Sequence, residues 1–151
     1  LFSAQTLFRT PFCVRLHQTH PLAQKDSLTI RDLAGETVAG KGRAYQCFRE
    51  KIDRYLLAQG LACNILLESS DETLLTSLAA QNKAIILEHG YTASLVAHPS
   101  TVLRPITVGA DDGVDICLLA RRGQLPTQSA RVFQQFLLTY LAAHPDDTAS
   151  S

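Results

Sequence analysis

The chain has 151 residues, 46% of which are hydrophobic, and its 14 basic residues balance its 14 acidic ones. This length and this hydrophobic content predict one soluble globular unit with a buried core, or part of such a unit. A nucleic-acid-binding protein gains most of its affinity by neutralising phosphates, so it normally carries a basic face or stripe. The longest basic run here is Arg121-Arg122, and these residues alone are therefore not expected to bind DNA tightly.

The cysteines and the start of the chain both indicate a cytoplasmic protein. Four cysteines, at positions 13, 47, 63 and 117, are widely spread and form no CxxC pair. Disulfide frameworks belong to small secreted chains and zinc sites need close ligand pairs, so we expect free, mostly buried thiols. The apolar start, LFSAQTLF, is too short to span a membrane and lacks the basic lead of a signal peptide. No membrane partner is expected.

Strand-like and helix-like segments alternate along the chain, which is typical of the α/β class. The expected strands are 12–16, 37–39, 64–68, 84–87, 102–108 and 114–120. The expected helices are 44–59, one that begins near 69–72, one or two turns within 91–96, and 127–143. A turn at 109–113 separates the last two strands, and the polar end DDTASS is expected to fray.

The expected helices are amphipathic, with apolar residues recurring every three or four positions. The first carries Tyr45, Phe48, Ile52, Tyr55 and Leu56 on one face, and Gly60 stands where a helix C-terminal glycine belongs. In the second, Ser69 and Glu72 have the spacing of a capping box. Its inward residues would be Leu74, Leu75, Leu78 and Ala79. The last helix has one apolar face made of Val132, Phe133, Phe136, Leu137, Tyr140 and Leu141.

The loop Gly40-Lys41-Gly42-Arg43 lies between an expected strand and an expected helix. Glycines permit a tight turn there, and the helix that follows offers unpaired N–H groups at the positive end of its dipole. Lys41 and Arg43 add positive charge, so an anionic small molecule could bind. The loop is not a nucleotide P-loop, which needs G-x-x-x-x-G-K-[ST]. A plain turn with two solvated cations is the alternative.

Enzyme and metal sites find little support in the sequence. No G-x-S-x-G elbow surrounds a serine. His17 and His20 stand three apart on an expected strand, on opposite faces, and the pair Glu88-His89 has no further ligand at helical spacing. Residues 111–112 belong to a turn without the alternating acidic ligands of a calcium loop. We expect no catalytic residues, no metal and no cofactor.

Three segments together resemble a known family. The run RLHQTHPLAQKDSLTIRDLAGETVAG has HPLA followed by DLAGE, and it resembles the effector-binding domain of LysR-type transcriptional regulators, where the chain passes from the first subdomain to the second. The segments ESSDETLLTSLAAQNKAIILEHG and ICLLARRGQLPTQSARVFQQFLLTYL follow in that family's order. The resemblance covers roughly 11–144.

The chain departs from the family pattern after its second helix. Gln81, Asn82 and Lys83 stand where the family commonly has Gly-x-Gly, and Glu88 stands near a usual proline. Asparagine is tolerated in the left-handed conformation at a helix C-terminus, whereas glutamine and lysine are strained there. The departure leaves the fold prediction unchanged but weakens any residue-by-residue transfer of pocket residues.

The resemblance implies an α/β fold, periplasmic-binding-protein-like of type II, with the second subdomain complete and the first only partly present. The implied parts are 1–35, the trailing part of the first subdomain and the crossover; 36–107, the second effector-binding subdomain; 108–145, the return strand and C-terminal helix; and 146–151, a polar tail. The chain contains no methionine, which indicates that Leu1 is not a native start. The resemblance implies that a DNA-reading domain precedes these residues.

The implied function is effector sensing, in which a small molecule held between subdomains modulates transcription. DNA would be bound only through the N-terminal helix-turn-helix domain. The expected effector-binding residues are Gly40, Lys41, Gly42, Arg43, Tyr45, Ser69 and Ser70. Self-association through the effector domain is expected to use helix 72–80 and strand 64–67. A solute-binding protein of the same fold is the alternative, and a catalytic α/β domain is a third possibility.

Overall fold

The computed structural model describes residues 1–42, 47–110 and 112–144, without the side chains of Cys47 and Phe48. Its contacts divide the chain into two compact units. The smaller unit combines residues 1–10 with 114–151, and the larger unit is the continuous stretch 11–113. Of the residues expected to line a site, Arg43 and Tyr45 lie outside the described residues.

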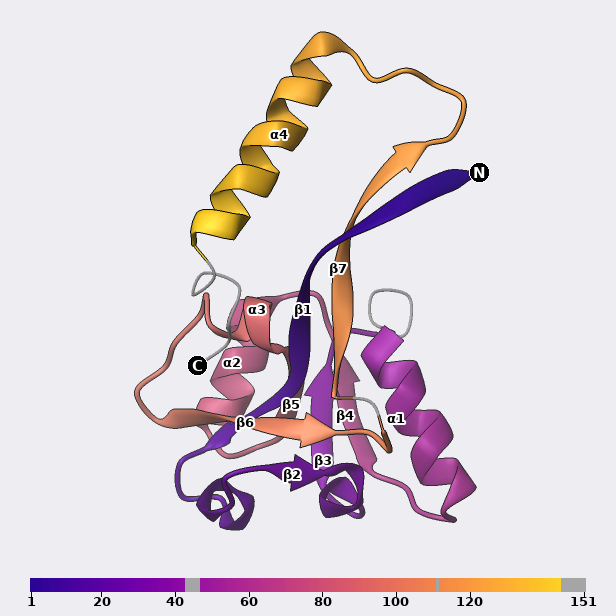
Figure 1. The fold of residues 1–151 in the computed structure, drawn as a ribbon. Helices are drawn as coiled ribbons and strands as arrows, with labels where there is room; N and C mark the ends of the chain where they lie inside the picture. Colours follow the sequence, from indigo (N-terminus) through magenta and orange to yellow (C-terminus); the bar gives the residue numbers. More distant parts are fainter. Residues whose placement is uncertain (43–46, 111, 145–151) are drawn as a thin grey trace. The chain divides into compact units, whose positions relative to one another are not determined.

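The larger unit is built around a mixed sheet with strand order β2-β6-β1-β5-β3-β4 (Figure 1). The strands are β1 (Phe2–His17), β2 (Leu28–Thr29), β3 (Thr37–Gly40), β4 (Asn64–Glu68), β5 (Ile85–His89) and β6 (Thr101–Thr107). The helices are the short 3-10 turns η1 (Pro21–Gln24) and η2 (Ile30–Leu33), and α1 (Cys47–Ala58), α2 (Glu72–Ala80) and α3 (Gly90–Ala93). Every expected strand and helix of this unit is confirmed in place. Most ends shift by a few residues, but β1 begins at Phe2 and not at the expected Phe12.

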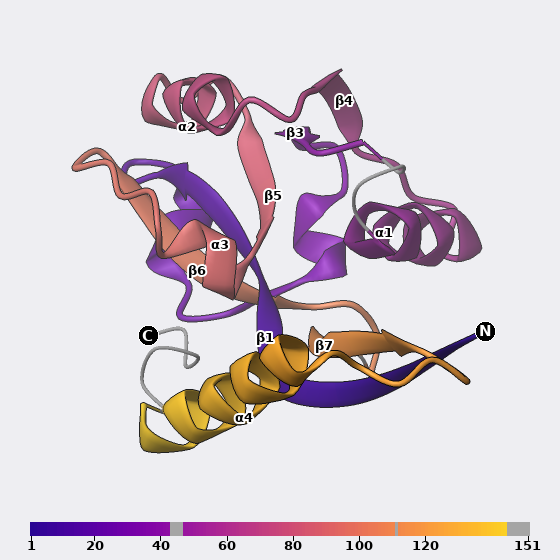
Figure 2. The ribbon, with the colours of Figure 1, turned by 90° about the horizontal axis from the view of Figure 1, so that it is seen from above.

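Strand β3 is the centre of the parallel part of the sheet. It pairs in parallel with β4 on one side and with β5 on the other. The chain therefore leaves β3 through α1 to reach β4, and it then returns through α2, past β3, to reach β5. Figures 1 and 2 show the two helices on opposite sides of these strands. Such a reversal of strand order marks the place where open α/β sheets bind ligands, at the carboxyl ends of the strands.

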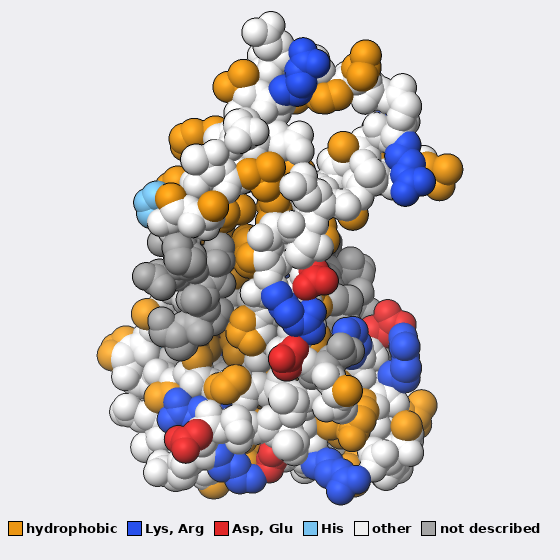
Figure 3. Space-filling model, in the orientation of Figure 1, with side chains coloured by type: hydrophobic (Ala, Val, Ile, Leu, Met, Phe, Trp, Pro, Cys, Tyr) orange, Lys and Arg blue, Asp and Glu red, His pale blue; other side chains and the backbone are white. Residues whose placement is uncertain are grey.

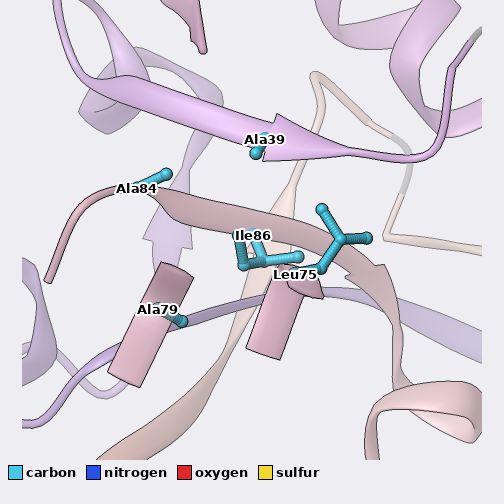
Figure 4. Close-up of a cluster of buried hydrophobic side chains, with 5 residues drawn as sticks. All are labelled: Ala39, Leu75, Ala79, Ala84 and Ile86. Atoms are coloured by element: carbon cyan, nitrogen blue, oxygen red, sulfur yellow. The ribbon is translucent and has the colours of Figure 1, made fainter. Parts of the chain in front are cut away.

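Helix α2 packs on β3 and β5 through a small hydrophobic cluster (Figure 4). The cluster consists of Ala39, Leu75, Ala79, Ala84 and Ile86, with Leu67 and Leu78 packed against it. Three of the four side chains expected to point inward from this helix therefore do so. The expectation for Leu74 is wrong, because its side chain is 41% exposed.

Helix α1 keeps the expected apolar face where its side chains are described. Ile52 and Leu56 are buried, and Tyr55 is half-buried. Gly60 follows the helix with φ +66°, the left-handed conformation expected of a C-terminal glycine. Asn82 takes the same conformation after α2, with φ 54°. Among residues 81–83 it is the one that tolerates this conformation.

The smaller unit consists of the first part of β1, strand β7 (Gly113–Arg121) and helix α4 (Gln128–Ala143). Arg9 forms an ion pair with Asp115 at 3.1 Å between β1 and β7. Thr127 caps α4 by accepting a hydrogen bond from the Ala130 N–H. The apolar face of α4 is uncovered among the described residues; Phe136, for example, is 65% exposed, and hydrophobic atoms are visible on this unit in Figure 3.

Candidate functional site

The expected effector loop begins at the carboxyl end of β3, beside the ends of β4 and β5. Gly40 pairs with Leu87 of β5 and with Glu68 of β4. Its carbonyl also accepts a hydrogen bond from the Ser69 N–H at 3.1 Å. A Cβ on Gly40 would lie 3.2 Å from the Leu87 carbonyl oxygen, so a glycine allows the strands to meet here. The structure thus brings Gly40 and Ser69 together, as the sequence reasoning expected.

Lys41 follows at the rim, where its ammonium group forms an ion pair with Glu72, the first residue of α2. The pair ties the loop after β3 to the beginning of α2. The charge of Lys41 also reaches the end of β5, where it contributes to lowering the pKa of His89, second to the effect of burial. Lys41 is therefore placed to act on an anion at this edge, but Glu72 already compensates its charge.

Gly42 lies against the carboxylate of Glu68. A Cβ at Gly42 would be 2.7 Å from Glu68 Oε2. The other carboxylate oxygen of Glu68 accepts a hydrogen bond from Arg49 Nη1 at 3.0 Å, and Arg49 Nε donates to Asp53 at 2.9 Å. Arg49 is buried, and it joins α1 to the end of β4. The sequence reasoning missed this arginine, although its spacing of four from Asp53 on a helix is a recognisable signal.

The N-terminus of α2 is capped by Asp71. Its carboxylate accepts hydrogen bonds from the N–H groups of Thr73 and Leu74 at 2.9 and 3.0 Å. Ser69 instead accepts a hydrogen bond from the Asp71 N–H at 3.1 Å, and Ser70 is exposed. The expected capping box of Ser69 and Glu72 is therefore wrong, because the helix begins two residues later than the capping box required. Two N–H groups at the start of α2 therefore already have an acceptor.

A buried ion pair joins β1 to β5, next to Leu87 at this edge of the sheet. Arg15 of β1 donates to both oxygens of Glu88 of β5, from Nε at 3.0 Å and from Nη2 at 3.1 Å. The same Nη2 donates to the Ala93 carbonyl at the end of α3, at 2.7 Å. Burial raises the pKa of the Glu88 carboxyl, and Arg15 only partly opposes that rise. This arginine was also missed from the sequence.

The described cysteines and histidines form no reactive cluster. Cys13, Cys63 and Cys117 are free thiols, and they range from buried to exposed. Burial raises the pKa of the Cys13 thiol to about 12, so this thiol stays protonated at neutral pH. No group of metal-ligating side chains occurs within residues 1–42, 47–110 and 112–144. In the same part of the chain, no helix is long and apolar enough to cross a membrane.

The comparisons with known proteins bear on the family and the fold of the chain. The family model described as the LysR substrate binding domain matches residues 1–142. Among solved structures, the effector-binding domain of QuiR in complex with shikimate is 20% identical with a TM-score of 0.76, covering 95% of this chain and 66% of that one. The regulatory domain of Synechocystis CcmR in complex with 2-PG is 16% identical with a TM-score of 0.77, covering 92% and 66%.

A third neighbour, the regulatory domain of MetR, a LysR family regulator from N. meningitidis, is 21% identical with a TM-score of 0.73, covering 94% of this chain and 65% of that one. The chain thus spans slightly less than two thirds of the length of these neighbours. No curated protein sequence matches it. Because the family model covers nearly the whole chain, the chain belongs to the LysR substrate binding domain family, with a periplasmic-binding-protein-like α/β fold.

Proposed function

We propose that this chain is the effector-sensing part of a LysR-type transcriptional regulator. The observation that carries the proposal is the family match over residues 1–142. Structural neighbours whose printed descriptions name a bound small molecule, shikimate for one and 2-PG for another, support it. The same match favours a cytoplasmic regulator over a solute-binding protein of the same fold, and over an enzyme.

The effector would lie at the carboxyl ends of β3 and β4. Gly40 and Ser69 are hydrogen-bonded to each other there, and Lys41, Gly42 and Ser70 stand beside them. The reversal of strand order at β3 supports this position. Arg43 and Tyr45, which lie outside the described residues, belong to the same proposed rim.

Anion recognition at this rim would compete with contacts that its donors already make. Lys41 is paired with Glu72, and Asp71 occupies two N–H groups of α2. An effector carboxylate or phosphate would compete with Glu72 for the charge of Lys41, whose ammonium group has three N–H donors. The effector's differential affinity for two arrangements of the domain would then set the regulatory state. DNA would be contacted by an N-terminal helix-turn-helix domain outside these residues.

Self-association is proposed through β4 and α2. Strand β4 ends the sheet order, so one side of its backbone has no neighbouring strand in the described sheet. Leu66 and Ile65 are 48% and 39% exposed on β4, and Leu74 is 41% exposed on α2. An open sheet edge with apolar side chains is a surface that another chain commonly covers.

The first test of the proposed function is the sequence encoded upstream of this chain in its open reading frame. A winged helix-turn-helix encoded upstream would support it, and a signal peptide there would contradict it. The rim is tested in the full-length protein with the Arg43→Ala variant, which should lose the response to inducer while keeping its affinity for operator DNA. An unchanged response would move the effector away from this loop.

A further inference from the structure

A hollow lies at the end of the parallel strands opposite the proposed effector rim. It is a cavity of about 300 Å³ within the larger unit, lined by three segments, 20–21, 35–37 and 82–85. Thr37 begins β3 and Ile85 begins β5, whereas the proposed effector rim is at the carboxyl ends of these strands. At a rise of about 3.3 Å per residue, β3 separates the two places by roughly 10 Å. The volume suits a small ligand, since pockets for drug-sized molecules start near this size.

The histidine in this cavity is held in one orientation. His20 caps the short helix η1, and its Nδ1 accepts a hydrogen bond from the Leu22 N–H at 3.2 Å. A nitrogen that accepts carries no proton, so the other ring nitrogen, Nε2, is the donor in this arrangement. That nitrogen lies 3.5 Å from Glu36 Oε2. The ring therefore positions the Glu36 carboxylate beside the cavity and leaves its other oxygen able to accept.

Donor groups face the same cavity from the turn after α2. Asn82 and Lys83 are exposed there, and Thr37 is half-buried at the start of β3. Across the described ranges, 1–42, 47–110 and 112–144, these three side chains form no hydrogen bond or ion pair. The left-handed backbone of Asn82, φ 54°, fixes the turn that presents them. Lys83 and Glu36 thus bring one positive and one negative charge to the lining of the cavity, beside His20.

We infer that this cavity binds a small zwitterion of the amino-acid class. Lys83 and the Asn82 amide supply donors for its carboxylate, and Glu36 supplies an acceptor for its ammonium group. A ligand with charge of one sign only would leave either Lys83 or Glu36 without a counter-charge at close range. A zwitterion compensates both, and charge-assisted hydrogen bonds are the stronger kind. The site goes beyond the proposed effector rim, since it shares no residue with it.

Binding is tested on the whole chain at neutral pH, with each standard L-α-amino acid as a separate probe. Thermal shift identifies candidates, and isothermal titration calorimetry measures their affinity. Lactate and ethylamine serve as controls, because each carries only one of the two charges. At least one amino acid should bind, and lactate and ethylamine should each bind at least about tenfold more weakly. Absence of binding by every amino acid would overturn the inference, as would equally tight binding of lactate.

Three variants locate the site. Lys83→Met removes the cation, Glu36→Gln removes the anion while keeping an acceptor for His20, and Asn82→Gly removes the amide while keeping a residue that favours positive φ. Each should weaken binding, with Lys83→Met and Glu36→Gln each losing at least about tenfold. Arg54→Gln, an exposed position on α1, is the control and should bind normally. Affinity unchanged in Lys83→Met or in Glu36→Gln would overturn the inference.

The test of this cavity is independent of the test of the proposed effector rim. Amide shifts of the isotopically labelled chain should move at 35–37 and 82–85 on addition of the amino acid, and stay unchanged at Gly40 and Ser69. Shifts confined to the rim would overturn the second site and support the first. Loss of the inducer response in rim variants says nothing about this cavity, so the two proposals fail separately.

Discussion

Arg15 and Glu88, 73 positions apart in the sequence, form a doubly hydrogen-bonded ion pair in the interior of the larger unit. Arg15 is 2% exposed and Glu88 5%. Arg15 also holds the carbonyl of Ala93 and, at 3.4 Å, the hydroxyl of Thr101. One guanidinium thus joins β1, β5, α3 and β6. Loss of one partner would leave a buried charge without compensation, which is costly.

We predict that Glu88→Leu alone destabilises the chain by roughly 3–5 kcal/mol, because Arg15 would stay buried and uncompensated. The double variant Arg15→Met, Glu88→Leu should recover most of that loss, since apolar side chains of similar volume often replace buried pairs at little cost. Urea denaturation followed by circular dichroism measures both. A double variant no more stable than the single one would show that packing, not charge, determines the cost.

The raised pKa of the Glu88 carboxyl predicts that the free energy of unfolding depends on pH. Burial raises the pKa of Glu88 in the folded chain above the ordinary value of 4.5, despite Arg15. The folded state therefore holds this proton more tightly than the unfolded state. Its contribution to stability is complete below pH 4.5, and is lost as the pH rises through the folded-state pKa. The free energy of unfolding, measured by urea titration at a series of pH values, should lose this component in Glu88→Gln. An identical pH profile in the variant would contradict the assignment.

The cap of α2 gives a sharper local test. Asp71→Ala should destabilise the chain by about 1 kcal/mol, because two N–H groups at the start of the helix lose their acceptor. Ser69→Ala is the matched control and should cost less, since Ser69 accepts only from the Asp71 N–H. Thermal unfolding distinguishes them. A larger loss of stability for Ser69→Ala would contradict Asp71 as the cap and would support the capping box of Ser69 and Glu72.

Self-association is predicted to depend on the open edge of the sheet. Leu66→Lys places a charge on an exposed position of β4, which should weaken pairing of two chains. Leu57→Lys, on exposed Leu57 of α1, serves as the control. Light scattering over a range of protein concentrations should give a larger mass for the control than for Leu66→Lys. A monomer at high concentration in the unmodified chain would count against the proposal.

Local patterns predicted the elements of this fold well, and long-range contacts account for what they missed. The spacing of Ile52 and Leu56 indicated the buried face of α1 because a helix repeats every few residues. By contrast, β1 begins at Phe2, whereas the sequence suggested a start at Phe12, and the added part lies in the unit where β1 pairs with β7, more than a hundred residues away. No periodicity encodes such a partner.

In the candidate site, too, local patterns predicted some features and long-range contacts account for the features that were missed. The glycine at position 40 indicated a close approach after β3, and the structure shows the strand contact that needs it. Helix α1 and strand β4 separate Lys41 from Glu72 along the chain, so no local pattern indicated that this cation is compensated. The same holds for Arg49 and Glu68, 19 positions apart.

The central claim, that this chain senses an effector at the carboxyl ends of β3 and β4, is tested most directly in the full-length regulator. The measurement compares operator binding and inducer response in the Lys41→Met variant, with Arg54→Gln as the control. Lys41→Met should keep its operator affinity and lose at least about tenfold in sensitivity to inducer, because the rim loses its described cation. An inducer response equal to that of the control, at unchanged operator affinity, would contradict the account.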